Sequence, residues 1–299
     1  MKKRRSAYIS SIALSIACSL LIVVTALFIA RPSLAKKVQH QLYRAGQASH
    51  TLVEDPNLDR QIAGPEGKQY HLSQVLQGQS DLDLFPSLLL VSPNHPLAQD
   101  YEADLVTDTY SQLEMSPLMV EDFAALSQAV SQEFSEKLYV SSLYRTAQGQ
   151  AEIFAEEPDL AMPPGASEHQ TGLALDVYVY QFAGQNFINA PAGRWVNENA
   201  WKYGFVIRYP QGQEDLTGMT FEPWHLRYVG QPHAEILTSQ GWVLESYLDQ
   251  IQPNHFYRFG SYILLRTKQE NFCLPAQLQD GKISPDNLGF YVIWGQMSS

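Results

Sequence analysis

The sequence predicts a mixed α+β domain that follows an apolar N-terminal segment. The chain has 299 residues, of which 45% are hydrophobic and 17% are charged, and this is the composition of an ordinary globular protein. Short apolar runs bounded by turn-forming residues predict strands, and longer stretches with apolar residues at helical spacing predict helices. Because strands and helices show little regular βαβ alternation, we expect an α+β arrangement rather than a parallel α/β sheet.

The apolar N-terminal segment covers residues 6–30 and contains no charged residue, whereas residues 2–5 are all basic. A helix of about 20 apolar residues crosses the hydrocarbon core of a bilayer, and a basic flank stays on the cytoplasmic side. We therefore expect a cytoplasmic segment over residues 1–5, a transmembrane anchor over 6–30 and a body outside the cytoplasm. The alternative is a cleaved signal peptide, whose apolar region is usually about 7–15 residues. Cleavage would make the body a secreted protein.

The charge and the cysteines restrict the class of protein further. The formal net charge is −11 even with the four N-terminal basic residues included, so the body is strongly acidic. Such a surface repels phosphates, and this excludes nucleic acid as a partner. Of the two cysteines, Cys18 lies in the apolar segment and Cys273 lies in the body, so we expect no intramolecular disulfide.

Composition divides the rest of the chain into three parts. Residues 31–69 are polar and weakly periodic, which predicts a stalk, and the body follows over residues 70–251. Residues 252–299 contain two short apolar runs and predict a small β appendage. Within the body the predicted strands are 87–91, 138–143, 173–179 and 205–209, and the predicted helices are 117–134, 147–157, 194–203 and most of 231–248.

A first candidate site lies in the stretch GASEHQTGLALDVYV, residues 165–179. As a strand, its second half places the alternate apolar residues Leu173, Leu175, Val177 and Val179 on one face. Asp176 then points to the opposite face beside the small Ala174, and a turn at Gly172 could fold His169 back toward it. A buried carboxylate needs a partner. Taken alone, this pair predicts either an ion pair or two ligands of a metal, with the ion pair the simpler interpretation.

A second candidate site lies in the octapeptide FEPWHLRY, residues 221–228. A regular strand would point Glu222 and His225 to opposite faces, but Pro223 disfavours a regular ladder, and a bend there could direct both to one place. The octapeptide alone equally predicts a surface strand with an ion pair between Glu222 and Arg227.

The two stretches together supply the residues of a hydrolytic zinc site. Such a site takes three protein ligands of histidine and carboxylate type and leaves a fourth position for water. His169, Asp176 and His225 form a set of this kind, and Glu222 is then the carboxylate that takes a proton from the water. No HExxH occurs in the sequence, which excludes the helical zinc-peptidase motif.

A third candidate is Arg145, in the stretch SSLYRTAQGQ at the end of a predicted strand and the start of a predicted helix. Arg145 could be an ordinary surface residue at a helix start. It could also be a fixed cation for a substrate carboxylate or for a developing oxyanion.

Three motifs in this order resemble those of a known family. Residues 142–150 fit S-x-Y-R-[ST]-x-x-x-Q, residues 167–176 fit S-x-H-x-x-G-x-A-x-D and residues 222–228 fit E-x-W-H-x-R-Y. The pattern resembles the VanY-type D-alanyl-D-alanine carboxypeptidases and their LD-carboxypeptidase relatives, over about residues 85–250. The resemblance implies the fold shared with hedgehog proteins, an antiparallel sheet with flanking helices. Thr146 and Leu143 depart from the commoner serine and glycine of the first motif.

The resemblance also implies an activity and a role for each matching residue. His169, Asp176 and His225 match the ligands of one Zn²⁺ per chain, Glu222 matches the catalytic base, and Arg145 matches the arginine that steadies the polarised carbonyl. Residues that match positions lining the substrate pocket are Gln150 and Ser167.

The implied enzyme is a zinc metallopeptidase that removes the terminal D-alanine of peptidoglycan stem peptides, either at a D-Ala-D-Ala bond or at an L-Lys- or diaminopimelate-D-Ala bond. The implied location of the domain is the cell-wall side of the membrane. Two alternatives stay open: an endopeptidase of the same fold that cleaves within the stem, and a zinc-bearing cell-wall binding module without catalysis. The remaining histidines are predicted to lie on the surface: His40, His50, His71, His95, His233 and His255.

Overall fold

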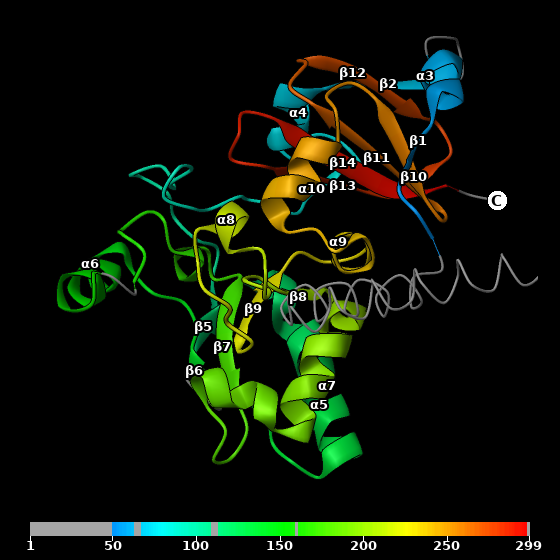
Figure 1. Cartoon of the computed structure of the whole chain (residues 1–299). Helices are drawn as coiled ribbons and strands as arrows, with labels where there is room; N and C mark the ends of the chain where they lie inside the picture. The colour runs from blue at the N-terminus through cyan, green and yellow to red at the C-terminus, as the bar shows by residue number, and fades with distance from the viewer. Residues whose placement is uncertain (1–49, 63–66, 109–112, 159–160, 298–299) are drawn as a thin grey trace, which may run out of the picture. The chain divides into compact units, whose positions relative to one another are not determined.

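The computed structural model describes residues 50–62, 67–108, 113–158 and 161–297 (Figure 1). The predicted cytoplasmic segment (1–5), the predicted anchor (6–30) and residues 31–49 of the predicted stalk lie outside the described residues. Within the described ranges, no helix has the length and apolar character needed to cross a membrane.

A four-stranded antiparallel sheet and several helices form the part of the chain that carries the motifs. The sheet has the order β6-β7-β9-β8, with strands β6 (Tyr139–Ser142), β7 (Ala174–Tyr178), β8 (Phe205–Ile207) and β9 (His225–Tyr228). The helices of this part are η1 (Pro117–Met119), α5 (Val120–Phe134), α6 (Ala147–Glu156), η2 (Glu168–Thr171), η3 (Gly184–Asn189), α7 (Pro191–Asn199), η4 (Ala200–Tyr203) and α8 (Glu214–Thr217). Two short strands, β4 (Val106–Thr107) and β5 (Glu114–Met115), pair beside it. The predicted antiparallel sheet with flanking helices is therefore confirmed.

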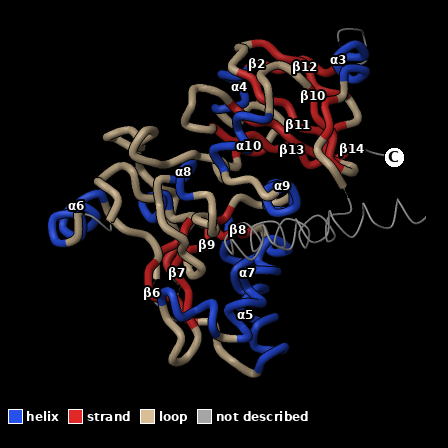
Figure 2. The backbone as a smooth tube through the Cα atoms, in the orientation of Figure 1, coloured by secondary structure: helices blue, strands red, loops and turns tan. Residues whose placement is uncertain are grey.

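Strand β7 is anchored by the face that the sequence predicted. All four apolar residues of that face are buried: Leu173, Leu175, Val177 and Val179. They belong to one core cluster with Leu126 and Val130 of α5 and Val196 of α7, and Figures 1 and 2 show these two helices beside the sheet. Because burying each such side chain stabilises the fold by about 1.5–3 kcal/mol, the register of β7 is fixed and so is the face on which Asp176 lies.

A second, six-stranded sheet is built mainly from the C-terminal segment (Figure 2). Its order is β1-β10-β11-β14-β13-β3, and β12 pairs separately with β2. The bounds are β1 (Val53–Glu54), β2 (Gly67–His71), β3 (Asp83–Leu84), β10 (Phe256–Phe259), β11 (Tyr262–Thr267), β12 (Asn271–Pro275), β13 (Leu278–Pro285) and β14 (Tyr291–Met297). Helices α3 (Pro56–Ile62) and α4 (Leu72–Leu76) lie between the first of these strands.

The predicted stalk boundary is wrong for the described part of residues 31–69. Strand β1 pairs with β10, with Val53 opposite Arg258, and β2 pairs with β12, with Tyr70 opposite Phe272. Residues 53–54 and 67–69 therefore belong to the β structure, and the predicted appendage over 252–299 is not built from that segment alone. The sequence signal is weak because only one of the five residues of β2, Tyr70, is buried.

The predicted strand over residues 87–91 is also wrong. The segment is buried, as its apolar residues predict, but its hydrogen bonds do not form a strand ladder. The carbonyl groups of Ser87 and Leu89 accept hydrogen bonds from Nη2 of Arg227, at 3.0 and 2.8 Å. A buried arginine thus satisfies backbone groups that a neighbouring strand would otherwise satisfy.

Two helices connect the site-bearing part to the second sheet. Helices α9 (His233–Gln240) and α10 (Leu244–Gln250) form one core cluster with Leu264 of β11 and Trp294 of β14. His233 is fully buried in this cluster, so the prediction of a surface histidine is wrong at this position. Its Nδ1 shares a 2.6 Å hydrogen bond with the Tyr247 hydroxyl, and its ring packs edge-on against Trp294. The Tyr247 hydroxyl and the indole ring explain why this imidazole lies inside the protein.

Candidate metal centre and active site

Sheet register brings Asp176 and His225 together. The two residues are directly opposite each other in the β7–β9 pair, and Ser142 of β6 is opposite Asp176 on the other side. Side chains that are directly opposite in an antiparallel pair lie on the same face about 4.5–5.5 Å apart at Cβ. Accordingly, His225 Nδ1 lies 3.0 Å from Asp176 Oδ1. The pairing of β7 with β9 thus places the Asp176 carboxylate beside the His225 imidazole.

His169 reaches the same place from the short helix η2, which ends at Gly172 in the left-handed conformation with φ of 70°. Its Nδ1 lies 2.7 Å from the carbonyl oxygen of Leu143, and its Nε2 lies 3.4 Å from Asp176 Oδ2. A carbonyl oxygen can only accept, so Nδ1 carries the hydrogen and Nε2 of the neutral ring presents a lone pair. Burial lowers the pKa of His169, which favours this neutral form.

Asp176 lies between the two imidazole rings, with Oδ1 on His225 and Oδ2 on His169. Burial raises the pKa of Asp176, but hydrogen bonds and charge interactions with His169 and His225 outweigh burial and hold the pKa well below its usual range. An ionised carboxylate faces the lone pair of His169 and the Nδ1 edge of His225. A cation placed among these three groups would satisfy all of them.

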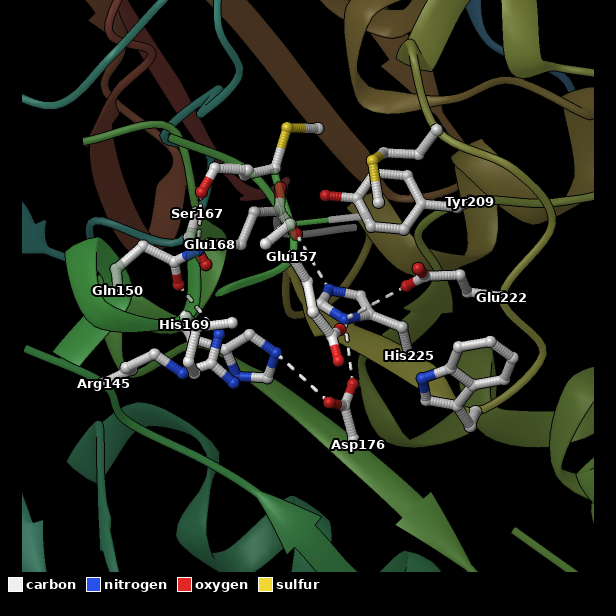
Figure 3. Close-up of a pocket in the computed structure, with 15 residues that line it drawn as sticks. Arg145, Gln150, Glu157, Ser167, Glu168, His169, Asp176, Tyr209, Glu222 and His225 are labelled. Carbon is white, nitrogen blue, oxygen red and sulfur yellow. Dashed lines mark hydrogen bonds and ion pairs between the residues drawn. The ribbon is translucent and has the colours of Figure 1, made fainter. Parts of the chain in front are cut away.

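Glu222 and His225 lie at the bend that the sequence predicted around Pro223. The amide of His225 donates to the carbonyl oxygen of Glu222 at 3.2 Å, and this turn directs both side chains to the pocket (Figure 3). Glu222 Oε2 lies 3.8 Å from His225 Nδ1. Burial raises the pKa of Glu222, and the negative charge of Asp176 raises it further. Glu222 is thus poised to hold and release a proton beside the cluster.

Arg145 lies at the pocket with its guanidinium fixed by two neighbours. Nη1 donates to Oε1 of Gln150 and Nη2 donates to Oγ of Ser142, both at 2.8 Å. Nε2 of Gln150 in turn donates to the carbonyl oxygen of Met162 at 2.6 Å. Arg145 is therefore not an ordinary surface residue at a helix start, because its side chain is half-buried and hydrogen-bonded to Gln150 and Ser142.

All seven sequence-predicted site residues border one pocket, which Figure 3 shows with its lining side chains. They are Arg145, Gln150, Ser167, His169, Asp176, Glu222 and His225. The walls also include the aromatic residues Tyr209 and Trp224, which the sequence analysis did not select. The pocket therefore combines apolar walls with convergent polar groups, as binding sites for small ligands do.

The donor set fits a single zinc ion. One atom each from His169, Asp176 and His225 lies within 4.8 Å of the other two. Two imidazole nitrogens and one carboxylate are a usual ligand set for zinc in hydrolytic sites. The hydrogen bond from His169 to the Leu143 carbonyl is the kind of contact that orients metal-binding histidines.

Glu168, the first residue of η2, directly precedes His169 and borders the pocket. Its side chain is buried, and its Oε1 accepts hydrogen bonds from Nε of Arg208 and from Nη1 of Arg227, both at 2.7 Å. Burial raises the pKa of Glu168, but the two arginines outweigh it and keep the group ionised. Arg227 is thus paired with Glu168 and not with Glu222, the alternative that the octapeptide suggested.

Arg208 and Arg227 were not among the predicted site residues, although their positions in the sequence indicate a buried ion pair. Arg208 and Arg227 both occur within apolar strand segments, FVIRY and HLRYV. A charge in such a segment is either exposed at a strand end or buried with a partner of opposite charge. The buried state requires a carboxylate close by, and Glu168 is the one beside a predicted site residue.

Comparison with known proteins places this geometry in a family. The family model described as "VanY: D-alanyl-D-alanine carboxypeptidase" matches residues 112–231, which include all the predicted site residues. The bifunctional D-Ala-D-Ala dipeptidase and D-Ala-D-Ala carboxypeptidase VanXYC of Enterococcus gallinarum is 33% identical over 182 residues, and the match covers 55% of this chain and 95% of that protein. The chain belongs to the VanY family.

Two further similarities extend the comparison within and beside the VanY family. A D-alanyl-D-alanine carboxypeptidase of Enterococcus faecium is 35% identical over 196 residues, and this chain spans 60% of the length of that relative. The structure of the LdcB LD-carboxypeptidase is similar with a TM-score of 0.51 and 32% identity, covering 55% of this chain and 86% of that one. The mixed α+β fold of the VanY-family part is thus shared with a carboxypeptidase of LD specificity.

Proposed function

We propose that this protein is a zinc-dependent carboxypeptidase that removes the terminal D-alanine from peptidoglycan stem peptides. The observation that carries the proposal is the cluster of His169, Asp176 and His225 with Glu222 beside it in one pocket. Membership of the VanY family supports the peptidase class, and the printed names of its relatives supply the substrate class.

Zinc would be held by Nε2 of His169, a carboxylate oxygen of Asp176 and Nδ1 of His225. When bound, the ion supplies Lewis acidity that polarises a carbonyl group and lowers the pKa of water to about 7. The buried leucines and valines of β7 keep Asp176 in place, and the Leu143 carbonyl keeps the His169 ring in its orientation. The chain therefore provides a preorganised site.

Glu222 is the proton carrier in this proposal. Its carboxylate borders the pocket 3.8 Å from His225 Nδ1, and burial raises its pKa. It takes the proton from the attacking water and delivers it to the nitrogen of the departing D-alanine. A carboxylate whose pKa is raised gives a better match to both proton transfers than an exposed glutamate does.

Arg145 is the fixed cation of the site. Its guanidinium is held by Gln150 and Ser142, so it can donate to the oxyanion that develops on the scissile carbonyl with little reorganisation. Ser167 borders the same pocket and offers a hydroxyl to the free carboxylate at the end of the substrate. Together these groups would orient the last peptide bond toward Glu222.

The test of the proposal is a Glu222→Ala variant of residues 31–299, which omit the apolar segment, assayed by mass spectrometry of muropeptides. We expect the variant to keep its zinc and to lose D-alanine release by at least about a hundredfold, since general acid–base catalysis contributes roughly 10²–10⁴ in rate. Glu156→Gln, which removes an exposed carboxylate at the end of α6 and outside the pocket lining, is the control and keeps the wild-type kcat. A zinc-loaded Glu222→Ala protein with full activity would contradict the assignment of the base.

The same assay separates the alternatives for the substrate. Pentapeptide and tetrapeptide muropeptides are supplied in parallel, with and without a chelator. Loss of D-alanine from the pentapeptide indicates DD specificity, loss from the tetrapeptide indicates LD specificity, and internal cleavage indicates an endopeptidase. Binding of zinc and muropeptide without turnover indicates a non-catalytic wall-binding module and contradicts the proposed enzyme.

For location, we propose that residues 6–30 anchor the chain in the membrane with the catalytic part on the cell-wall side. The support is the charge-free apolar segment and the basic residues 2–5 that precede it. The measurement is fractionation of cells that produce the full chain, followed by protease treatment of spheroplasts. Release of the protein into the medium would instead indicate cleavage of the segment.

A further inference from the structure

Two buried polar atoms in the wall of the pocket face each other and have no hydrogen-bond partner among the described residues. They are Oε2 of Glu168 and Nε2 of His225, and they lie 3.6 Å apart. This separation is about 0.7 Å longer than an ordinary N–H···O hydrogen bond. A buried polar atom without a partner destabilises the folded protein, so a small movement that joins the two atoms would be favourable.

The opposite edge of the His225 ring is the edge that faces the candidate metal centre. Nδ1 lies 3.0 Å from Asp176 Oδ1 and 3.8 Å from Glu222 Oε2, whereas Nε2, on the other edge of the ring, lies 3.6 Å from Glu168 Oε2 (Figure 3). A neutral imidazole has one N–H group and one lone pair. If Nδ1 binds the metal, the hydrogen must be on Nε2, and it then points at an ionised carboxylate oxygen that can only accept.

Glu168 is held rigidly for this contact. Its Oε1 accepts hydrogen bonds from Nε of Arg208 and from Nη1 of Arg227, each at 2.7 Å. Nη1 and Nη2 of Arg208 bind Glu245 of helix α10 at 2.9 and 2.6 Å. With Oε1 fixed by two charged donors that are themselves anchored, Oε2 is left free and directed at His225.

From this arrangement we infer that Glu168 is a positioning residue of the metal centre. Its Oε2 accepts the Nε2–H group of His225 and so selects the tautomer and the ring orientation in which Nδ1 is free to bind the metal. The inference rests on the zinc site of the proposed function. In metal sites generally, a hydrogen-bond acceptor on the second ring nitrogen orients a metal-binding histidine. Loss of such an acceptor typically weakens metal binding 10- to 100-fold.

The deciding variant is Glu168→Gln. The single amide oxygen is drawn to the two arginines, which need an acceptor, and the NH₂ group then points at Nε2 of His225. An NH₂ group donates, so it favours a lone pair on Nε2 and places the hydrogen on Nδ1, where it blocks the metal. We expect zinc affinity, measured by competition with a chromophoric chelator, to fall 10- to 100-fold.

The matched control is Glu245→Gln, which removes a charge from the other side of the same Arg208. Glu245 lies outside the metal centre, so this variant lowers the melting temperature but keeps zinc affinity within about twofold of the wild type. A purely structural role for Glu168 would produce the same pattern in both variants. Glu168→Asp provides a second test, because it keeps the charge for the arginines but ends one methylene short of His225 and therefore also weakens zinc binding.

A spectroscopic measurement on the wild type needs no variant. Nitrogen-15 spectra of the zinc-loaded protein are expected to show His225 protonated at Nε2, with the proton in a hydrogen bond and protected from exchange. Protonation at Nδ1, or a Glu168→Gln protein that binds zinc as tightly as the wild type, would overturn this inference alone. A wild type that binds no zinc would overturn the proposed metal centre and this inference with it.

Discussion

At the scale of single residues, the arginine of the pocket owes its position to a glutamine. Gln150 is almost completely buried and uses both ends of its amide, one to accept from Arg145 and one to donate to the Met162 carbonyl. The sequence motif assigns it to the substrate pocket, which it does border. Its hydrogen bonds indicate that it acts on substrate mainly through Arg145.

We therefore expect Gln150→Ala to lower kcat about 10- to 100-fold with a smaller change in KM. A hydrogen bond to a charged group is worth about 1.5–3 kcal/mol, and without it the guanidinium is no longer oriented. The control is Gln148→Ala, because Gln148 is an exposed residue of α6, the helix that also contains Gln150; this variant keeps wild-type kinetics. A normal kcat with a raised KM in Gln150→Ala would mean that Gln150 binds substrate directly.

At the scale of elements, helix α7 contains a glycine that its packing requires. A Cβ added at Gly193 would lie 1.9 Å from the carbonyl oxygen of Phe187, so the helix and η3 approach more closely than any side chain allows. This close approach completes the core against which β7 packs, since Phe187 and Val196 belong to the same cluster. The glycine thus contributes indirectly to the placement of Asp176.

Gly193→Ala is expected to lower the free energy of unfolding. Alanine is the better helix former by about 1 kcal/mol, but a clash with a backbone carbonyl cannot be relieved by a side-chain rotation, and overpacking costs roughly 1–3 kcal/mol or more. Urea denaturation measures the difference. Gly149→Ala in α6, where the nearest atom to an added Cβ is 3.4 Å away, serves as the control and is expected to be neutral or stabilising.

At the scale of the whole described chain, two sheets are joined through helices α9 and α10 and a buried histidine. His233 faces the Tyr247 hydroxyl, the Trp294 ring and the positive charge of Lys282. Burial, with a smaller contribution from Lys282, lowers the pKa of His233 to about 3. The histidine is therefore neutral in the folded protein at pH values where it is protonated in the unfolded chain.

The folded state then loses stability as the pH falls. Between about pH 6.5 and pH 3 the unfolded chain binds a proton at His233 that the folded protein does not bind, so protonation favours unfolding throughout this range. For His233→Gln we expect a shallower fall of the unfolding free energy, by up to about 1.4 kcal/mol per pH unit. Urea denaturation of both proteins at pH 7, 6, 5 and 4 gives the slopes. Equal slopes would show that His233 is protonated in the folded state.

The sequence by itself determined the α+β class and most helices and strands of the motif-bearing part, and its seven candidate site residues border one pocket. Local rules placed part of this site: the alternation along residues 173–179 fixes the face of Asp176, and the bend at Pro223 turns Glu222 and His225 to one side. Both rules act within a few residues, so one sequence is sufficient to apply them. The resemblance to the VanY-type carboxypeptidases supplied the roles of three further residues, Arg145, Gln150 and Ser167.

The tertiary structure decided where chain segments far apart in sequence meet. Strand β2 was read as stalk because one buried side chain gives no periodic signal, and it becomes a strand only through β12, about 200 residues later. His233 was assigned to the surface and Glu168 was given no role, because the burial of a charged or titratable group depends on its partners. Those partners, Tyr247 for the first and two arginines for the second, come from other elements, and only the packed fold brings them together.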